Sequence, residues 1–125
     1  MSQKAATKKP AKLNWEKVRK TFAAPGAAAC VTAVVQDADT GEVLMAGHAN
    51  IDAVRLMIAT RQLALWSTSR KGLWIKGQTS GNTFEVVEIR ADCDADAILI
   101  RVRGQGPMCH TGARSCFFET VLPSQ

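Results

Sequence analysis

With 125 residues, 46% of them hydrophobic and 22% charged, the chain has the size and composition of one globular domain. It contains no run of about 18 apolar residues, which excludes a membrane-spanning helix. Its first residues lack the apolar core and cleavage pattern of a secretory signal, so we expect a cytoplasmic protein.

The net charge of +5 is concentrated at the N-terminus. Residues 1–20 contain seven Lys or Arg and a single Glu, whereas the rest of the chain holds nine basic and ten acidic residues. We therefore expect a disordered basic tail over residues 1–12 and a single, nearly neutral domain over residues 13–125. Such a tail can touch RNA or another acidic surface, although a solubilising extension is the simpler interpretation.

The first predicted elements are a short helix and a β-hairpin. Residues 14–22 (NWEKVRKTF) combine a possible N-cap with apolar residues at helical spacing, and PGAAA ends the helix. The apolar runs at 30–37 and 42–47 are separated by ADTG, a turn-rich tetrapeptide that predicts a hairpin.

A second helix is predicted over residues 50–62. Asn50 is the expected N-cap, and Asp52 places negative charge in the first turn, where it suits the helix dipole. The apolar residues of this segment fall on one helical face.

The chain then becomes rich in predicted strands. Short β-branched or aromatic runs occur at 63–69, 73–77, 83–90 and 97–103, separated by polar or Gly-containing turns. A Gly/Pro loop from residue 104 is expected to lead into a further short strand. The pattern predicts an α+β fold that is β-rich, with a mainly antiparallel sheet, one clear helix and a short N-terminal helix.

The stretch ADCDADA at 91–97 concentrates negative charge at alternate positions. In an extended chain alternate side chains share a face, so Asp92, Asp94 and Asp96 are expected to converge while Cys93 points the other way. Three carboxylates suit a hard cation such as Mg²⁺. A solvated acidic turn is the alternative, and an EF-hand loop is excluded because its required Gly and Glu are missing.

Four cysteines in a chain without an export signal favour ligands or nucleophiles over disulfides. Cys30 lies in an apolar run and is expected to be a small buried hydrophobic residue. Cys93 precedes Cys109 by sixteen residues, and Cys116 follows Cys109 by seven. Three thiolates would leave an open fourth position on zinc, as in catalytic sites. The spacing lacks the tight knuckle of zinc fingers, so plain burial of each cysteine is the alternative.

Other residues are candidates for proton transfer and substrate binding. His110 adjoins Cys109 in a polar loop, where it can act as a general acid or base or simply be a surface histidine. The segments STSRKG and KGQTSGN offer hydroxyls, amides and cations suited to phosphate oxygens, without a Walker pattern. Trp74 can stack on a base or pack in the core.

Three motifs together resemble the phosphoribosyl-AMP cyclohydrolase family of histidine biosynthesis. They are SGN at 80–82, DCDADA at 92–97 and CHTGARSCF at 109–117, preceded by SRKGLWIKGQT in the family's order. The resemblance covers about residues 30–118 and implies an intertwined homodimer that binds zinc with ligands from both subunits, together with a Mg²⁺ site. The implied zinc ligands are Cys93, Cys109 and Cys116, and the implied magnesium ligands are Asp92, Asp94 and Asp96.

The resemblance also implies a reaction. Water adds at C6 of the electron-poor ring of N1-(5-phosphoribosyl)-AMP, and the N1–C6 bond breaks to give the formimino aminoimidazole carboxamide ribonucleotide. Zinc with an open position lowers the pKa of its bound water from about 15.7 toward roughly 7, which supplies hydroxide. His110 is the expected base, and Mg²⁺ is expected to bind phosphate. The candidate substrate-binding residues are Ser69, Arg70, Trp74, Lys76, Thr79, Ser80 and Asn82.

A protein of another class is the competing interpretation: a zinc-stabilised interaction module that grips nucleic acid through its basic tail. The nearly neutral body and the missing zinc knuckle favour the enzyme, so nucleic-acid binding is not expected. Relatives of the family can be fused to a pyrophosphohydrolase domain. A chain of 125 residues leaves no room for one, and we expect a monofunctional chain.

Overall fold

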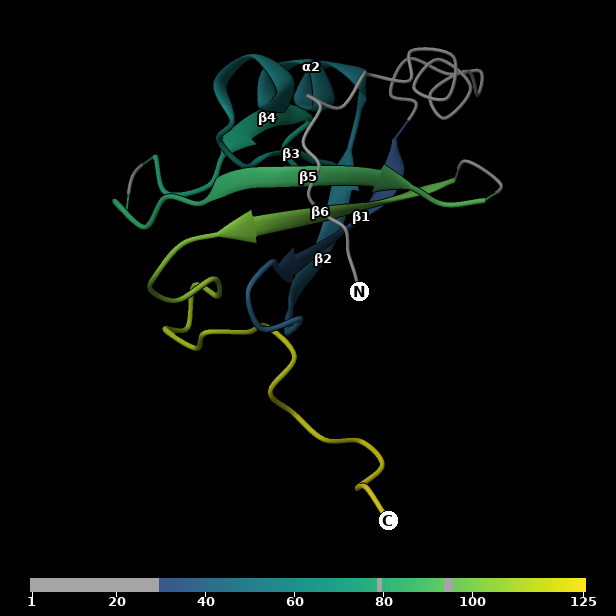
Figure 1. The fold of residues 1–125 in the computed structure, drawn as a ribbon, viewed down its shortest axis with the longest axis vertical. Helices are drawn as coiled ribbons and strands as arrows, with labels where there is room; N and C mark the ends of the chain where they lie inside the picture. Colours follow the sequence, from purple (N-terminus) through teal and green to yellow (C-terminus); the bar gives the residue numbers. More distant parts are fainter. Residues whose placement is uncertain (1–29, 79, 94–95) are drawn as a thin grey trace.

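The computed structural model of the protein describes residues 30–78, 80–93 and 96–125. The predicted basic tail, the predicted helix at 14–22, Thr79 and Asp94 lie outside these residues. Within them, six strands and one helix follow one another along the chain (Figure 1). Their bounds are β1 Val31–Asp37, β2 Val43–Ala49, α2 Ile51–Thr60, β3 Ala64–Ser67, β4 Gly72–Ile75, β5 Glu85–Ala91 and β6 Ala97–Arg103.

The strands of the described chain form one mixed sheet in the order β4-β3-β2-β1-β6-β5. Neighbours are antiparallel, as predicted, except that β1 and β6 run parallel from Thr32↔Ala97 to Asp37↔Val102. The predicted hairpin is β1–β2, and the four later apolar runs are β3 to β6. Because β1 and β6 are parallel, their carboxyl ends meet at one edge, where Ala38 N–H donates to Val102 O at 2.8 Å.

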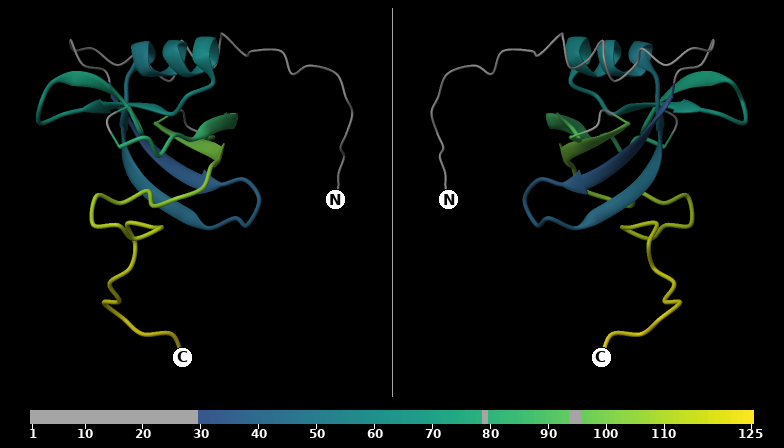
Figure 2. Two further views of the ribbon diagram at one scale, coloured as in Figure 1. Left: turned by 90° about the vertical axis from the view of Figure 1, so that its left-hand side faces the viewer. Right: turned by 90° about the vertical axis from the view of Figure 1, so that its right-hand side faces the viewer.

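The sheet curls until its β5 edge meets the segment that precedes β3 (Figure 2). Leu63 N–H donates to Phe84 O at 3.1 Å, and Val86 N–H donates to Arg61 O at 2.7 Å. These bonds satisfy backbone groups that an open sheet edge would leave unpaired. They also hold the chain before β5 against the segment that precedes β3.

The helix α2 begins where the sequence predicts, at Asn50. The Asn50 side-chain oxygen accepts Ala53 N–H at 2.9 Å, which satisfies one of the amides left without a partner at a helix start. The helix ends at Arg61, whose backbone is left-handed with φ 63° and whose N–H donates to Met57 O at 2.8 Å. Its buried face packs over one end of the curled sheet (Figure 2). No helix in the described residues is long and apolar enough to cross a membrane.

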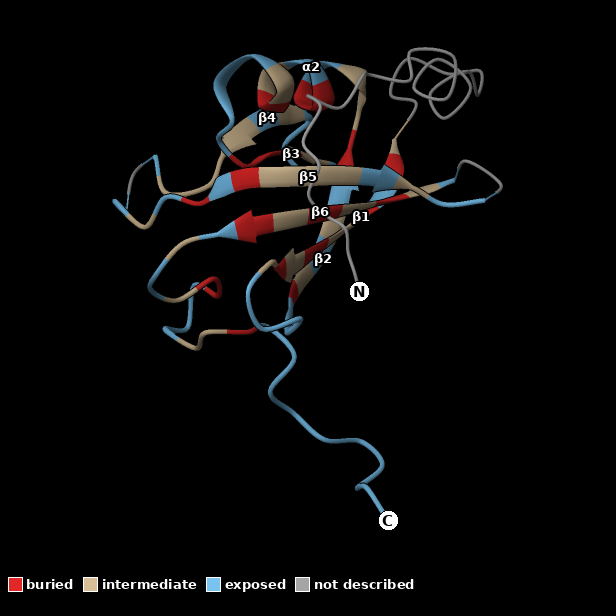
Figure 3. Ribbon diagram, viewed as in Figure 1, coloured by how far each residue is buried: buried red, intermediate tan, exposed pale blue. Residues whose placement is uncertain are grey.

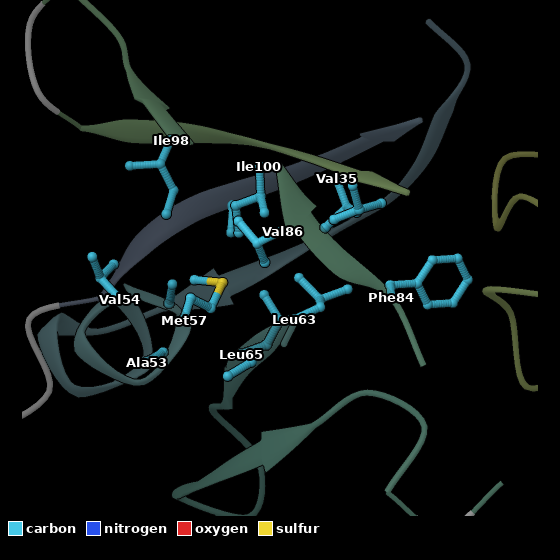
Figure 4. Close-up of a cluster of buried hydrophobic side chains, with 14 of the residues drawn as sticks. Val35, Ala53, Val54, Met57, Leu63, Leu65, Phe84, Val86, Ile98 and Ile100 are labelled. Atoms are coloured by element: carbon cyan, nitrogen blue, oxygen red, sulfur yellow. The ribbon is translucent and has the colours of Figure 1, made fainter. Parts of the chain in front are cut away.

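The core lies between the curled sheet and α2 (Figures 3 and 4). Phe84 and Leu65 are 1% exposed, and Met57 and Leu63 are fully buried. Burial of one such side chain contributes about 1.5–3 kcal/mol. Cys30, expected to be buried, is partly buried just before β1. The core residues labelled in Figure 4 are Val35, Ala53, Val54, Met57, Leu63, Leu65, Phe84, Val86, Ile98 and Ile100.

A β-bulge explains why the sequence of β5 alternates imperfectly. The register shifts between Val86 and Glu88, so that one extra residue of β5 opposes β6. Before the bulge Phe84 and Val86 face the core, and after it Ile89 packs against the core instead. Because of the extra residue, the core-facing residues change from even to odd positions along β5. The alternation of the strand is therefore interrupted once.

The short strand predicted after the Gly/Pro loop is wrong, because residues 104–125 contain neither helix nor strand. The segment is attached to the sheet locally, through Ser115 Oγ, which donates to Val43 O at 2.8 Å. Beyond this point the chain leaves the body (Figure 1), and Val121 is 99% exposed. A strand needs a neighbour along its length, and this segment runs away from the sheet.

Candidate metal and substrate site

Cys109 and Cys116 lie on a closed loop that follows β6. Met108 N–H donates to Arg114 O at 3.0 Å, and Cys109 N–H donates to Ala113 O at 3.1 Å. These two bonds fold the motif CHTGARSC back on itself. Cys109 and Cys116 therefore lie close enough for each thiol to shift the pKa of the other, although seven positions separate them in the sequence.

The pKa values of the two thiols of this loop are shifted in opposite directions. Thr111 Oγ1 donates to Cys109 Sγ at 3.1 Å. That bond lowers the pKa of Cys109, with further help from the Thr111 backbone and the charge of Lys76. Burial of its sulfur and the neighbouring Cys109 raise the pKa of Cys116, although that residue as a whole is exposed. A thiol that ionises readily beside a second sulfur is a donor pair that fits zinc.

The Cys116 end of the loop is anchored to β2. Cys116 N–H donates to Leu44 O at 2.7 Å, and Ser115 Oγ donates to Val43 O at 2.8 Å. Ser115 Oγ also accepts Phe117 N–H at 3.0 Å, and the residue is 8% exposed. Because strand β2 is part of the sheet, these bonds fix the backbone that carries Cys116.

Arg114, which sequence reasoning did not assign to the site, ties the loop to the body. Its Nη2 lies 2.8 Å from Asp37 Oδ2, and its Nη1 donates to Gly106 O at 2.6 Å. The guanidinium also lies over the Phe84 ring. The Arg114 hydrogen bond, followed by one from the Asp39 backbone, lowers the pKa of Asp37. Because Arg114 and Asp37 are 77 positions apart, no local sequence motif predicts their pairing.

The predicted substrate loop KGQTSGN packs against the segment that leads to Cys109. Gly77 has φ 86°, and a Cβ at this position would collide with the Asn82 backbone. A Cβ at Gly106 would lie 2.8 Å from Asn82 Oδ1. Ser80 Oγ accepts Asn82 N–H at 3.3 Å, and Thr79 lies outside the described residues. A shallow hollow between the two segments is lined by Gly81, Asn82, Thr83, Gln105 and Gly106.

Lys76 and His110 complete the group of predicted residues around the cysteine loop. Lys76 lies close enough for its charge to lower the pKa of Cys109, and its backbone N–H donates to Leu63 O at 2.9 Å. His110 directly follows Cys109 and is exposed. Sulfur, a cation, an imidazole and the hydroxyl and amide groups of the SGN motif therefore occupy neighbouring segments.

Three other predicted substrate residues lie on the β3–β4 hairpin. Ser69 Oγ lies 3.3 Å from Ser67 Oγ, which accepts Arg70 N–H at 3.1 Å. These bonds shape the turn in which Ser69 and Arg70 are exposed. Trp74 lies on β4 and packs against the core. Core packing, the alternative considered for this tryptophan, thus accounts for its position, and substrate binding by all three stays a prediction.

The described residues on either side of positions 94–95 close a turn between β5 and β6, which corrects the expectation of an extended segment. Asp92 Oδ1 accepts Asp96 N–H at 3.0 Å and Ala97 N–H at 3.4 Å, and Asp92 N–H donates to Ala97 O at 3.0 Å. Alternation along an extended segment therefore does not account for where Asp92 and Asp96 lie. Asp94 lies outside the described residues, and the magnesium site stays a prediction.

Cys93 lies at the other end of β6 from Cys109 and Cys116. It is exposed in the turn before the strand, whereas the two other cysteines follow the strand. A strand of seven residues spans about 23 Å. Consistently, no three His, Cys, Asp or Glu side chains within residues 30–78, 80–93 and 96–125 gather closely enough to hold a metal ion.

Comparison with known proteins agrees with the motifs. The sequence model of the family described as Phosphoribosyl-AMP cyclohydrolase matches residues 45–118. The chain belongs to the phosphoribosyl-AMP cyclohydrolase family. A protein of that name from Sphingopyxis alaskensis is 56% identical over 95 residues, which are 76% of this chain and 75% of the relative. Another, from Brucella abortus, is 52% identical over 100 residues, which are 78% of this chain and 84% of the relative.

The cyclohydrolase match begins in β2 and ends just after the cysteine loop. It therefore includes every residue that the sequence predicts for the site, from Ser69 to Cys116. The family match thus spans the loop after β6, the SGN loop and the acidic turn, and the roles of the individual residues in them stay predictions.

Proposed function

We propose that the protein opens the adenine ring of N1-(5-phosphoribosyl)-AMP with the help of zinc, in a site completed by a second copy of the chain. The hydrolase activity follows from family membership, since relatives 52% and 56% identical carry the name phosphoribosyl-AMP cyclohydrolase, an enzyme of histidine biosynthesis. The finer proposal concerns the metal. Cys109, Cys116 and Cys93 of the partner subunit would hold it.

The observation that carries this proposal is the separation of the three sulfurs. Cys109 and Cys116 interact on one loop, and Cys93 is exposed at the far end of β6. Zinc in a catalytic site needs a third protein ligand. In a symmetric dimer, two exposed turns can each reach the cysteine loop of the other chain, which would form two equivalent sites.

The chemistry then divides between the metal and the side chains. Zinc held by three thiolates would supply a Lewis acid that makes water more acidic. His110 is the proposed base, because it is exposed and directly follows Cys109. The water oxygen becomes the carboxamide oxygen on C6. N1 departs with the electron pair of the broken bond and takes up a proton, which His110 can return.

The phosphates of the substrate are assigned to polar groups of two loops. Lys76, Ser80 and Asn82 come from the loop that packs against the 104–106 segment beside the shallow hollow, and Arg70 and Ser69 come from the β3–β4 turn. Mg²⁺ at Asp92, Asp94 and Asp96 would bind phosphate oxygens, which suits a cation that holds its waters tightly. Thr79 belongs to the same proposal.

A mixing experiment tests the shared site. Cys93→Ala and Cys109→Ala chains are each expected to be inactive, because every site in each homodimer lacks a ligand. When the two are denatured together and refolded, half of the dimers contain both chains and one intact site each. Activity should return to about a quarter of the wild-type value in a symmetric dimer. Ring opening is followed by ultraviolet absorbance, with zinc measured in the same samples.

The matched control is a mixture of Cys109→Ala with Cys116→Ala, which should stay inactive because both sulfurs come from one loop. If the Cys93→Ala and Cys109→Ala mixture also stays inactive, although both chains refold into dimers, the shared site is wrong. An unchanged rate of ring opening in zinc-free wild-type protein would contradict a catalytic role for the metal.

A further inference from the structure

We propose that Arg114 and Asp37 are positioning residues, whose ion pair sets the geometry of the Cys109–Cys116 loop and thereby its affinity for zinc. This inference deepens the proposed function, because it rests on zinc binding by these two cysteines. It concerns residues outside the predicted ligand set.

The Arg114 guanidinium contacts three separate parts of the fold. Nη2 lies 2.8 Å from Asp37 Oδ2, Nη1 donates to Gly106 O at 2.6 Å, and the guanidinium carbon lies 5.5 Å from the centroid of the Phe84 ring. A planar guanidinium with fixed N–H directions can serve such partners at once, whereas a lysine ammonium is a single point charge. Arg114 thus joins the cysteine loop to β1, to the chain after β6 and to the chain before β5.

Asp37 is itself held firmly at the end of β1. Its Oδ1 accepts Asp39 N–H at 2.8 Å and Thr40 N–H at 3.3 Å. Its side chain is 11% exposed and that of Arg114 is 33% exposed, so solvent screens the pair less than an open surface pair. The carboxylate is therefore a fixed point of the β1–β2 turn, not a mobile counter-ion.

Both ends of the cysteine pair are positioned against the β1–β2 hairpin. Cys116 N–H donates to Leu44 O at the start of β2, and Arg114 reaches the end of β1. Cys109 is fixed to the residue before Arg114, because its N–H donates to Ala113 O. If Arg114 lost its anchor, Cys109 would be free to shift while Cys116 kept its own bond to β2. The separation of the two sulfurs would then no longer be set.

An ion pair with a purely structural role has a different signature, which is lower stability without a change in metal affinity. The same turn offers a matched control in Arg103, whose Nε lies 3.2 Å from Asp39 Oδ1. That pair is exposed on both sides, and Arg103 ends β6 before the cysteine loop begins. Removing this pair tests whether the loss of any ion pair at this turn lowers the affinity for zinc.

The zinc affinity of the full-length wild-type chain is compared with that of Arg114→Gln, Asp37→Asn and Arg103→Gln. Each affinity is measured by competition with a chromophoric chelator, at a temperature well below the unfolding midpoints. We expect Arg114→Gln and Asp37→Asn to weaken zinc binding about 10- to 100-fold, as for other partners of metal ligands. Arg103→Gln should bind as wild type, and Arg114→Lys should fall between. Unchanged zinc affinity in Arg114→Gln, with a lower Tm alone, overturns the proposal. If that variant does not fold by circular dichroism, Asp37→Asn, which keeps the shape of the side chain, decides in its place.

A second readout separates this inference from the proposed function. In a chain carrying Cys30→Ala and Cys93→Ala, phenylarsine oxide binds Cys109 and Cys116 in proportion to how well the two sulfurs are placed. We expect Arg114→Gln to weaken this binding and Arg103→Gln to leave it unchanged. If wild-type protein binds no zinc but the arsenical result holds, the proposed function fails and the positioning of the sulfurs stands. Equal arsenical affinity with and without Arg114 overturns the positioning role.

Discussion

The two ends of β6 carry cysteine-bearing segments that are built in different ways. The loop after the strand is held by its own backbone bonds, by β2 and by Arg114, and it presents two interacting sulfurs. The turn before the strand is shaped by Asp92, and its Cys93 is exposed. One chain therefore preorganises two of the three proposed zinc ligands and presents the third at its surface. A preformed pair needs less ordering when the metal arrives, and an exposed third ligand suits a partner chain.

The largest expected effect comes from removing sulfur at either end. Cys109→Ala and Cys93→Ala should each lower kcat/KM at least about a thousandfold, because a Lewis-acid metal contributes several kcal/mol to the barrier. Zinc content should fall in both. The two variants should differ in one respect: Cys93→Ala keeps the pair that binds phenylarsine oxide, and Cys109→Ala loses it. Equal arsenical binding by both would contradict the division between a preformed loop and a separate turn.

The next effect concerns the KGQTSGN loop, which packs against the segment that leads to Cys109. Gly77→Ala adds a Cβ that collides with the Asn82 backbone at a positive φ of 86°. We expect the free energy of unfolding to fall by about 3 kcal/mol, since a left-handed conformation costs roughly 1–2 kcal/mol and the collision adds a similar amount. Gly81→Ala is the matched control, because its φ is 84° and nothing lies within 4 Å. It should cost about 1 kcal/mol in urea unfolding. Equal losses in the two variants would show that close packing at Gly77 is unimportant.

The Arg114–Asp37 ion pair makes stability depend on pH in a definite direction. The pKa of Asp37 lies below its ordinary value of 3.8 in the folded state, with the Arg114 hydrogen bond as the largest cause. Its contribution is therefore complete above the ordinary value and is lost as the pH falls through the lowered value, because the unfolded chain takes up the proton first. We expect Asp37→Asn to cost about 1–2 kcal/mol at neutral pH, less than a fully buried pair.

Urea unfolding of wild type and Asp37→Asn at several pH values measures this contribution. The difference between the two proteins should stay constant from neutral pH to about pH 5 and shrink below it. Comparing the two proteins removes the effect of the other carboxylates that they share. A difference that grows as the pH falls would have the wrong sign for a depressed pKa.

The sequence predicts the parts of the fold that depend on neighbouring residues. Asn50 caps its helix through an amide three positions away, and ADTG turns the β1–β2 hairpin within four residues. Both signals are local, so both predictions are confirmed. The bulge in β5 appeared in the sequence as an imperfect alternation, but the pattern alone did not show that one residue was inserted.

What the sequence does not predict depends on contacts between distant segments. The parallel pairing of β1 with β6 follows from how the whole sheet curls, and nothing in either strand records it. Arg114 finds Asp37 across 77 positions. The grouping of Cys93, Cys109 and Cys116 was implied by the family resemblance, and within one chain Cys93 does not join the other two. The alternating aspartates were interpreted as an extended segment, whereas Asp92 closes a turn onto Asp96 and Ala97 that depends on the two strands it connects.

The smallest expected effect tests whether the acidic turn also supports itself. Asp92→Asn keeps a carbonyl oxygen to accept the amides of Asp96 and Ala97, whereas Asp92→Ala removes the acceptor. We therefore expect Asp92→Ala to lower the free energy of unfolding by about 1 kcal/mol and Asp92→Asn to change it little. Both variants should bind Mg²⁺ more weakly by calorimetry, because each removes a carboxylate charge. If Asp92→Asn binds Mg²⁺ as tightly as wild type, Asp92 shapes the turn without holding a cation. The turn would then be self-supporting like the cysteine loop, and the contrast between the two ends of β6 would be confined to their sulfurs.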